Sequence, residues 1–320
     1  MRLTGLLPLL RTDPAVAFLT EQAGRGRPAE LLAAGAPRGA RAPVVAELSR
    51  AAAGRTIVVV TATGRDADEA RDALRAYLPA DDVAVLPAWE TLPHERLSPR
   101  ADTVARRIAV FRRLAHPEVP VVESDGAPDA PPSSNAPGGS GAGGVAGPIR
   151  VLLVPVRALL QPVVRGLGDL EPVTVATGDV IDLDEVARRL EAAAYTRVDM
   201  VERRGEFAVR GGILDVFPPT ESHPMRIELF GDEVEELRWF SVADQRSLEL
   251  AERPLWAPPC RELLLTEQVR ARALALRDAL PGATDMLERM SQGIAVEGME
   301  SLAPALVDGM VPVVDLLPEG

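Results

Sequence analysis

Hydrophobic and polar positions follow two different patterns along this chain. In the first half, short apolar runs that indicate buried strands alternate with longer stretches of helical spacing. We expect strands at 56–61, 83–86 and 150–154, and helices at 15–22, 44–53, 66–77, 103–114 and 157–161. This order predicts an α/β domain whose first part covers residues 1–171.

The pattern changes at residue 172, where short strands of strict alternation begin to dominate. Such a run of strands, joined to one helix, is typical of a small α+β unit, which we assign to residues 172–254. Beyond it, helical spacing resumes, so residues 255–320 are expected to return to the first domain as its second part. In these two regions we expect a strand at 173–176 and helices at 182–194, 266–280 and 284–292.

The alternation is clearest in the segment 225–230. Side chains two residues apart share a face of a strand, so Arg226 and Phe230 point away from a core formed by the apolar residues between them. The glycine-containing pairs 211–212 and 231–232 are placed to turn the chain between neighbouring strands. The sequence therefore predicts two β-hairpins with an aromatic side chain among the charges of the outer face.

Arg210 also occupies an outward-facing strand position. Arginine and aromatic side chains supply much of the binding energy in protein interfaces, which makes Arg210, Arg226 and Phe230 a candidate protein-binding patch. The alternative is an ordinary solvated strand face, because surface arginines and single exposed aromatics are common. The pattern alone leaves both interpretations open.

Composition restricts the class of protein. The chain has 320 residues, 47% of them hydrophobic, and no apolar run approaches the ~20 residues that a membrane-spanning helix needs. The short apolar run at 6–10 is interrupted by Pro8 and lacks a signal-peptide pattern, so we expect a cytoplasmic protein without membrane contact. The net charge of -12 disfavours binding of nucleic acid by neutralisation of its phosphates.

Candidate chemistry is sparse. All 35 basic residues are arginine, which excludes lysine nucleophiles and the phosphate-binding lysine of a P-loop. The three histidines have no carboxylate or cysteine at ligand spacing, and the single cysteine, Cys260, has no partner for a disulfide. We therefore expect no catalytic residue and no metal site.

Two further segments have a distinct composition. Residues 123–148 change abruptly to Pro, Gly, Ser and Ala without hydrophobic periodicity, which predicts a disordered insertion. The helix expected at 103–114 carries four arginines that we interpret as a solvated outward face: Arg106, Arg107, Arg112 and Arg113.

Several stretches resemble one protein family. The sequences at 205–218, 226–233 and 244–247 are similar to the module that is shared by the excision-repair helicase UvrB and the transcription-repair coupling factors (Mfd). Three other stretches resemble the coupling factors in particular, at 87–95, 154–161 and 293–300. The resemblance implies an α/β fold with a degenerate P-loop, a helicase-like domain split in sequence by a small α+β domain that binds the repair protein UvrA.

The resemblance also assigns candidate sites. Arg210, Arg226 and Phe230 match positions at which the family contacts UvrA, where the arginines would pair with acidic groups and the phenyl ring would be an anchor. Apolar residues at 31–34 lead into a Gly-rich loop at 35–43, the order of a nucleotide-binding βαβ unit and the position of the UvrB Walker A motif. Its phosphate-binding residues are replaced, which leaves a degenerate remnant: Gly35, Gly39, Ala40, Arg41 and Ala42. This part of the protein would be an adaptor without a cofactor.

The resemblance implies further domains outside this sequence. We expect an N-terminal part of a longer protein whose other domains bind RNA polymerase and move along DNA with ATP and Mg²⁺. A C-terminal domain would cover the UvrA-binding face at rest. The alternative is a UvrB-type helicase subunit, which would need a P-loop lysine and a tyrosine-rich hairpin that holds DNA, and neither is present at the matching positions.

Overall fold

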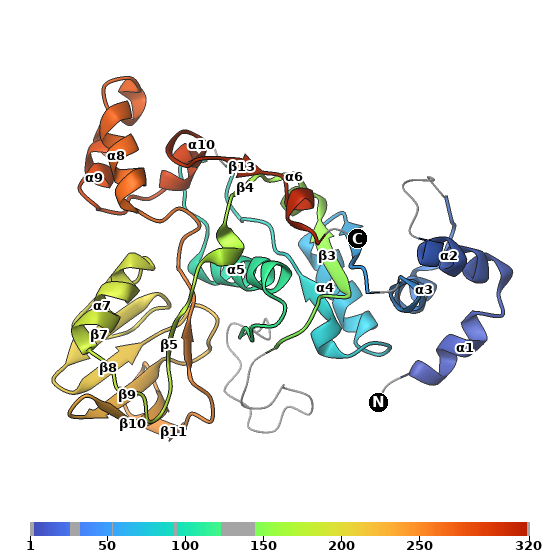
Figure 1. Ribbon diagram of the computed structural model, residues 1–320, viewed down its shortest axis with the longest axis horizontal. Helices are drawn as coiled ribbons and strands as arrows, with labels where there is room; N and C mark the ends of the chain where they lie inside the picture. The colour runs from blue at the N-terminus through green and yellow to red at the C-terminus, as the bar shows by residue number, and fades with distance from the viewer. Residues whose placement is uncertain (1–2, 26–32, 53, 93–94, 123–144, 319–320) are drawn as a thin grey trace.

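The computed structural model describes residues 3–25, 33–52, 54–92, 95–122 and 145–318. In Figure 1 a small parallel sheet, a larger antiparallel sheet and a projecting helical hairpin are arranged around the central helix α5. None of the described helices is long and apolar enough to cross a membrane. The α-helices are α1 (Leu7–Leu10), α2 (Pro14–Arg25), α3 (Arg38–Ala51), α4 (Gly64–Leu74), α5 (Ala101–Ala115), α6 (Val156–Leu160), α7 (Leu183–Ala192), α8 (Glu267–Leu276), α9 (Thr284–Ser291) and α10 (Ala303–Leu306).

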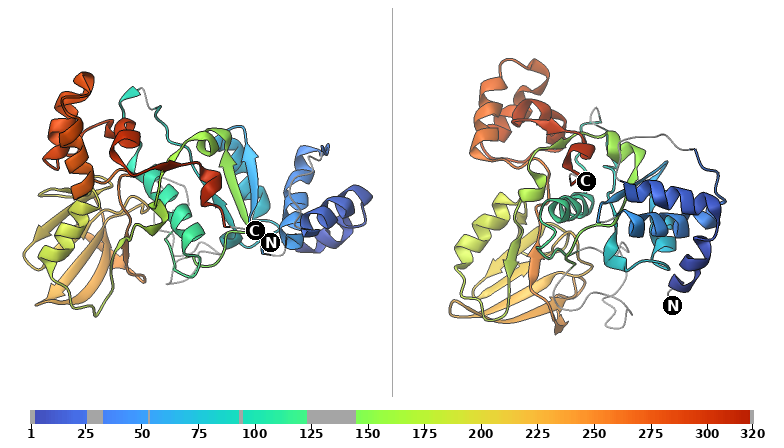
Figure 2. Two further views of the ribbon diagram at one scale, coloured as in Figure 1. Left: turned by 45° about the horizontal axis from the view of Figure 1, so that its top comes forward. Right: turned by 45° about the vertical axis from the view of Figure 1, so that its right-hand side comes forward.

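The N-terminal half contains a three-stranded parallel sheet. Strand β3 (Val151–Pro155) lies between β1 (Ile57–Thr61) and β2 (Val83–Val85). Because the central strand β3 is buried on both faces, its apolar side chains contribute to two clusters, one under α4 and one under α5 and α6. Figure 2 shows this sheet between the N-terminal helices and α5. The predicted strands and the helices that connect them are confirmed.

The C-terminal segment packs beside this sheet. Strand β13 (Met310–Val311) pairs with β4 (Val163–Val164) in an antiparallel ladder, and Val313 is buried in the cluster that also holds Leu152 and Val154 of β3. Helices α8 and α9, drawn in orange in Figure 1, form a hairpin whose hydrophobic core also includes Met299, Ala303 and Leu306. Residues far apart in the sequence therefore share one core.

The larger sheet has six strands in the order β11-β10-β9-β8-β7-β6. All neighbours are antiparallel except β6 and β7. Helix α7 covers the inner face, and its first turn is capped by Asp182, whose carboxylate accepts the backbone N–H groups of Asp184 and Glu185. The strands are β6 (Thr196–Arg197), β7 (Glu206–Arg210), β8 (Ile213–Val216), β9 (Met225–Phe230), β10 (Glu233–Phe240) and β11 (Ser247–Leu250).

The predicted solvated face of α5 is wrong. Arg107 and Arg113 are fully buried and Arg112 is nearly so, whereas Arg106 is partly exposed. Helix α5 lies between the parallel sheet and the six-stranded sheet (Figure 1), so it has no free side toward solvent over most of its length. The guanidinium groups donate hydrogen bonds to distant partners. Arg107 donates to the Glu262 carboxylate, and Arg112 donates to the Leu170 carbonyl oxygen.

The predicted insertion is shorter than expected at its C-terminal end. Val145 is buried and exchanges backbone hydrogen bonds of 2.9 and 2.7 Å with Val121, so residues 145–148 belong to the ordered fold. The remaining residues of the predicted insertion, 123–144, lie outside the described ranges.

Candidate protein-binding face of the six-stranded sheet

The hairpin of β9 and β10 presents an aromatic side chain to solvent. Phe230 ends β9 and lies opposite Glu233, which begins β10, so Gly231 and Asp232 form a two-residue turn. Gly231 has a φ of +69°, a left-handed conformation that glycine adopts without steric cost. The Phe230 side chain is 79% exposed. A large apolar side chain held in water by a short, closed hairpin is suited to anchor a protein partner.

Strand alternation separates the two faces of β9. Met225 and Ile227 are buried in the core under α7, whereas Arg226 and Phe230 lie on the outer face. This confirms the alternation expected for the segment. It does not by itself make the outer face a binding site, because the contacts of each outward side chain decide what it can offer to a partner.

A buried carboxylate organises the arginines of the outer face. Asp215 on β8 is fully buried, and Arg226 donates to it twice, from Nε to Oδ1 at 2.8 Å and from Nη2 to Oδ2 at 3.0 Å. Arg210 on β7 also pairs with Oδ2 of Asp215. The Asp215 carboxylate raises the pKa of Arg226 because it favours the charged guanidinium. The Arg226 guanidinium additionally stacks on the Phe240 ring, 4.7 Å from the centroid.

The two arginines therefore differ in what they can do. The Arg226 side chain is only 13% exposed and also donates to the backbone oxygen of Gln245, which has a strained φ of +59°. Its main role in the free protein is to hold Asp215 and the loop before β11. The Arg210 side chain is 45% exposed and can reach a partner while it keeps its contact to Asp215. The contact to Asp215 was not expected for either arginine, and the partner-binding role of Arg210 and Arg226 stays a prediction.

Part of the outer face is covered. Val201, Ala208, Phe217 and Phe240 form a second, smaller hydrophobic cluster on this side of the sheet. The open region is consequently the end that carries the two hairpin turns. Sequence reasoning missed this cover, although the outward parity of Ala208 and Phe240 could have indicated an apolar contact on the outer face.

The degenerate Walker A residues lie in a helix rather than in a loop. Helix α3 begins at Arg38, so Gly39, Ala40, Arg41 and Ala42 lie within its first turns, and residues 33–37 form no strand. The apolar residues 31 and 32 lie outside the described ranges. Arg41 is exposed, and Pro43 inside the helix removes one backbone N–H. The predicted loop conformation of 38–43 is wrong, because a helix accommodates the alanine and arginine residues that replace the usual loop sequence.

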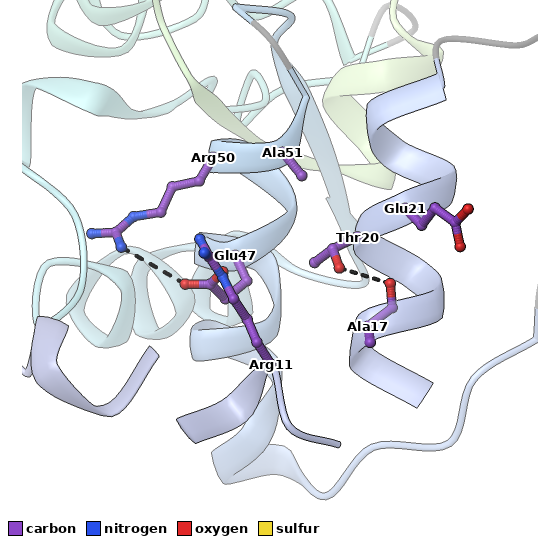
Figure 3. Close-up of a pocket in the computed structure, with 7 residues that line it drawn as sticks. All are labelled: Arg11, Ala17, Thr20, Glu21, Glu47, Arg50 and Ala51. Carbon is purple, nitrogen blue, oxygen red and sulfur yellow. Dashed lines mark hydrogen bonds and ion pairs between the residues drawn. The ribbon is translucent and has the colours of Figure 1, made fainter. Parts of the chain in front are cut away.

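A cavity of about 450 Å³ opens between α2 and α3 (Figure 3). Its buried carboxylate, Glu47, accepts a hydrogen bond from Arg11 and lies 3.7 Å from Arg50. Glu47 is six residues beyond Arg41, roughly 9 Å along the helix axis, so the cavity is separate from the Walker A positions. Both of its arginines, Arg11 and Arg50, pair with this one carboxylate. Within the ranges described, no group of three or more His, Cys, Asp or Glu side chains could hold a metal ion.

Comparison with known proteins agrees with this geometry. Residues 173–258, which include α7 and the six-stranded sheet, match the family model of the UvrB interaction domain. The chain therefore contains a UvrB interaction domain. Part of this chain is also similar to a UvrABC system protein B: that of Acinetobacter baylyi is 45% identical over 24% of this chain and 12% of the relative.

The similarity to one class of longer proteins extends over nearly the whole chain. The transcription-repair-coupling factor of Mycobacterium tuberculosis is 47% identical over 99% of this chain, and that of Myxococcus xanthus is 33% identical over 78%. The chain is thus a homologue of the transcription-repair-coupling factors. It spans about a quarter of the length of the mycobacterial relative, 24%.

Proposed function

We propose that this chain is the UvrA-binding adaptor of a transcription-repair coupling factor, which recruits nucleotide excision repair to a stalled RNA polymerase. The observation that supports it most is Phe230, exposed at the tip of a closed hairpin inside the region that matches the UvrB interaction domain. Arg210 and Arg226 belong to the same outer face. In this proposal Phe230 is the apolar anchor, Arg210 pairs with the partner, and Arg226 keeps the face in shape.

The remaining assignments belong to the same proposal. The chain would be divided into a helicase-like α/β domain at 1–171 and 255–320 and the UvrA-binding domain at 172–254. Contacts with RNA polymerase and DNA, and ATP-driven translocation with Mg²⁺, would be made by parts of the longer protein beyond this sequence. A domain from that region would cover the UvrA-binding face at rest. The whole protein would act in the cytoplasm.

The rival function is that of a UvrB-type helicase subunit. A helicase needs a phosphate-binding loop with a lysine, and this chain contains only arginine among its basic residues. The helical conformation of residues 38–43 and the exposed Arg41 also favour an adaptor that binds no nucleotide. The shared interaction domain explains the similarity to UvrB without requiring helicase activity.

The test is UvrA binding, measured by titration, for four variants that are checked for folding by circular dichroism. Phe230→Ala should weaken binding by about thirtyfold, the typical effect of losing an anchor worth roughly 2 kcal/mol, and should leave stability unchanged because the ring is exposed. Arg210→Ala should weaken binding less. Arg226→Ala should lower both binding and stability, because Asp215 loses its bidentate partner inside the protein.

The matched control is Arg188→Ala. Arg188 lies on α7, on the opposite side of the sheet, with a side chain that is 66% exposed and paired only with Glu185 among the described residues. This variant should bind like the parent. If folded Phe230→Ala and Arg210→Ala also bind UvrA like the parent, the outer face is not the binding site and the proposed function loses its structural basis.

A further inference from the structure

The outer face continues past Phe230 across strand β10. Phe230 lies opposite Glu233, and on the other side of Glu233 an isolated antiparallel bridge joins it to Val180. Residues directly opposite each other in antiparallel strands point to the same face. Phe230, Glu233 and Val180 therefore form one row across the sheet, at the end with the hairpin turns.

Val180 is held in this position by its neighbours. The backbone N–H of Ile181 donates to the backbone carbonyl oxygen of Asp232, and that of Val234 donates to the backbone carbonyl oxygen of Asp179, both at 2.8 Å. Ile181 packs against the core under α7, so the preceding side chain, Val180, must point outward. Its side chain is 70% exposed. The chain thus maintains a second apolar side chain in water on a fixed backbone.

The surroundings of this row are acidic. Asp232, Glu233 and Glu235 are exposed, and none of them has an ion pair with another described residue. Farther along the face the single Asp215 carboxylate is shared by Arg226 and Arg210, so the positive charge that remains unneutralised lies there and not beside Val180 and Phe230. The unneutralised charge beside the two apolar side chains is therefore negative, which favours a partner surface that carries positive charge.

We propose that Val180 and Phe230 together anchor the protein partner, which meets them with an apolar recess rimmed by basic side chains that face Glu233. This rests on the proposed function, and the partner is the UvrA of that proposal. The surface is continuous with the face that contains Arg210 and Phe230. Two apolar anchors on one row, flanked by unpaired carboxylates, also specify the orientation of the partner along the hairpin tip, since a recess must fit both side chains at once.

Affinity measurements with UvrA test the proposal. Val180→Asp should weaken binding about tenfold or more, because it removes an apolar contact and adds like charge to an acidic region. Glu233→Arg should weaken binding and reduce its dependence on salt, since it opposes the basic rim. The control is Leu160→Asp on α6, an aliphatic side chain that is 76% exposed and outside this face, which should bind like the parent.

A cross-linking experiment tests proximity directly. The chain has a single cysteine, Cys260, which is buried, and burial raises the pKa of its thiol to about 12. A maleimide photo-cross-linker at pH 7 should therefore label Val180→Cys and leave Cys260 unmodified. Illumination should join Val180→Cys to UvrA, whereas Leu160→Cys should give no product.

The outcomes separate the two proposals. If Phe230→Ala loses binding but Val180→Asp binds like the parent and position 180 does not cross-link, the second anchor is wrong and the proposed function stands. Tighter binding by Glu233→Arg would overturn the basic rim. If the parent chain does not bind UvrA, both proposals fail.

Discussion

Arg107 was expected on a solvated helix face, but it is fully buried and paired with Glu262. Its replacement by alanine therefore tests whether this buried ion pair stabilises the fold. The Arg107 Nε group donates to Glu262, 155 residues away in the sequence, and both side chains are essentially inaccessible to solvent. Nη1 donates to the Pro87 carbonyl oxygen at 2.8 Å, and the guanidinium lies 5.3 Å from the centroid of the Phe111 ring. Arg107→Ala would remove all of these contacts at once.

The expected cost follows from what is left behind. Among the described residues, Glu262 would keep only the Trp89 Nε1–H donor at 2.9 Å, and its Oε2 atom has no hydrogen-bond partner there even with Arg107 present. An uncompensated buried charge of this kind typically destabilises a protein by about 3–5 kcal/mol. Replacing both members with apolar residues of similar size, as in Arg107→Met with Glu262→Leu, should recover most of that loss.

Urea denaturation followed by circular dichroism measures the effect. The matched control is Arg106→Ala on the same helix, where the side chain is 35% exposed and a loss below about 0.5 kcal/mol is expected. A loss below about 1 kcal/mol for Arg107→Ala would refute the buried ion pair. A double variant less stable than either single variant would contradict the account of the Glu262 charge.

Two further predictions concern the N-terminal half. Deleting residues 123–144 and joining Val122 to Val145 through a short Gly/Ser linker should change the melting temperature by less than about 2 °C, because Val121 and Val145 are already hydrogen-bonded to each other and loop closure depends weakly on length. Extending the deletion through residue 148 should destabilise the protein, since Val145 is buried. Isothermal titration with Mg-ATP should give no saturable heat, and micromolar binding would show that helix α3 has rebuilt a phosphate site and would contradict the adaptor proposal.

The sequence predicts local structure well where the signal is itself local. The β9–β10 hairpin follows from the alternation on β9 and a glycine that can take a positive φ, whereas the register shift between Val234 and Glu236 on β10 does not follow from the pattern. Its outward arginine and phenylalanine follow from parity alone. The parallel sheet follows in the same way from apolar runs separated by helical spacing.

What the sequence could not predict is pairing between distant segments. The α5 arginines have ordinary surface spacing, and their burial depends on Glu262, Leu170 and Gly147, which lie outside the helix. On the outer face, the partner of Arg226 is Asp215, which sits inside an apolar run and carries no local sign of its role. Periodicity reports which way a side chain points but not whether another segment has already occupied that space.

The connections between the UvrB interaction domain and the rest of the chain determine the direction in which the β9–β10 hairpin points. Strand β5 (Val173–Val175) leads into this domain and β12 (Leu255–Ala257) leads out of it, and the two pair with each other. Directly after the exit, Glu262 is fixed to Arg107 of α5, and Arg261 donates to Glu300 at 2.7 Å and to Ser98 at 2.9 Å. Paired entry and exit strands, followed by buried polar contacts to the other parts of the chain, restrict rotation of the domain. The β9–β10 hairpin, with Phe230 at its end, is therefore held in a defined direction relative to α5 and the parallel sheet.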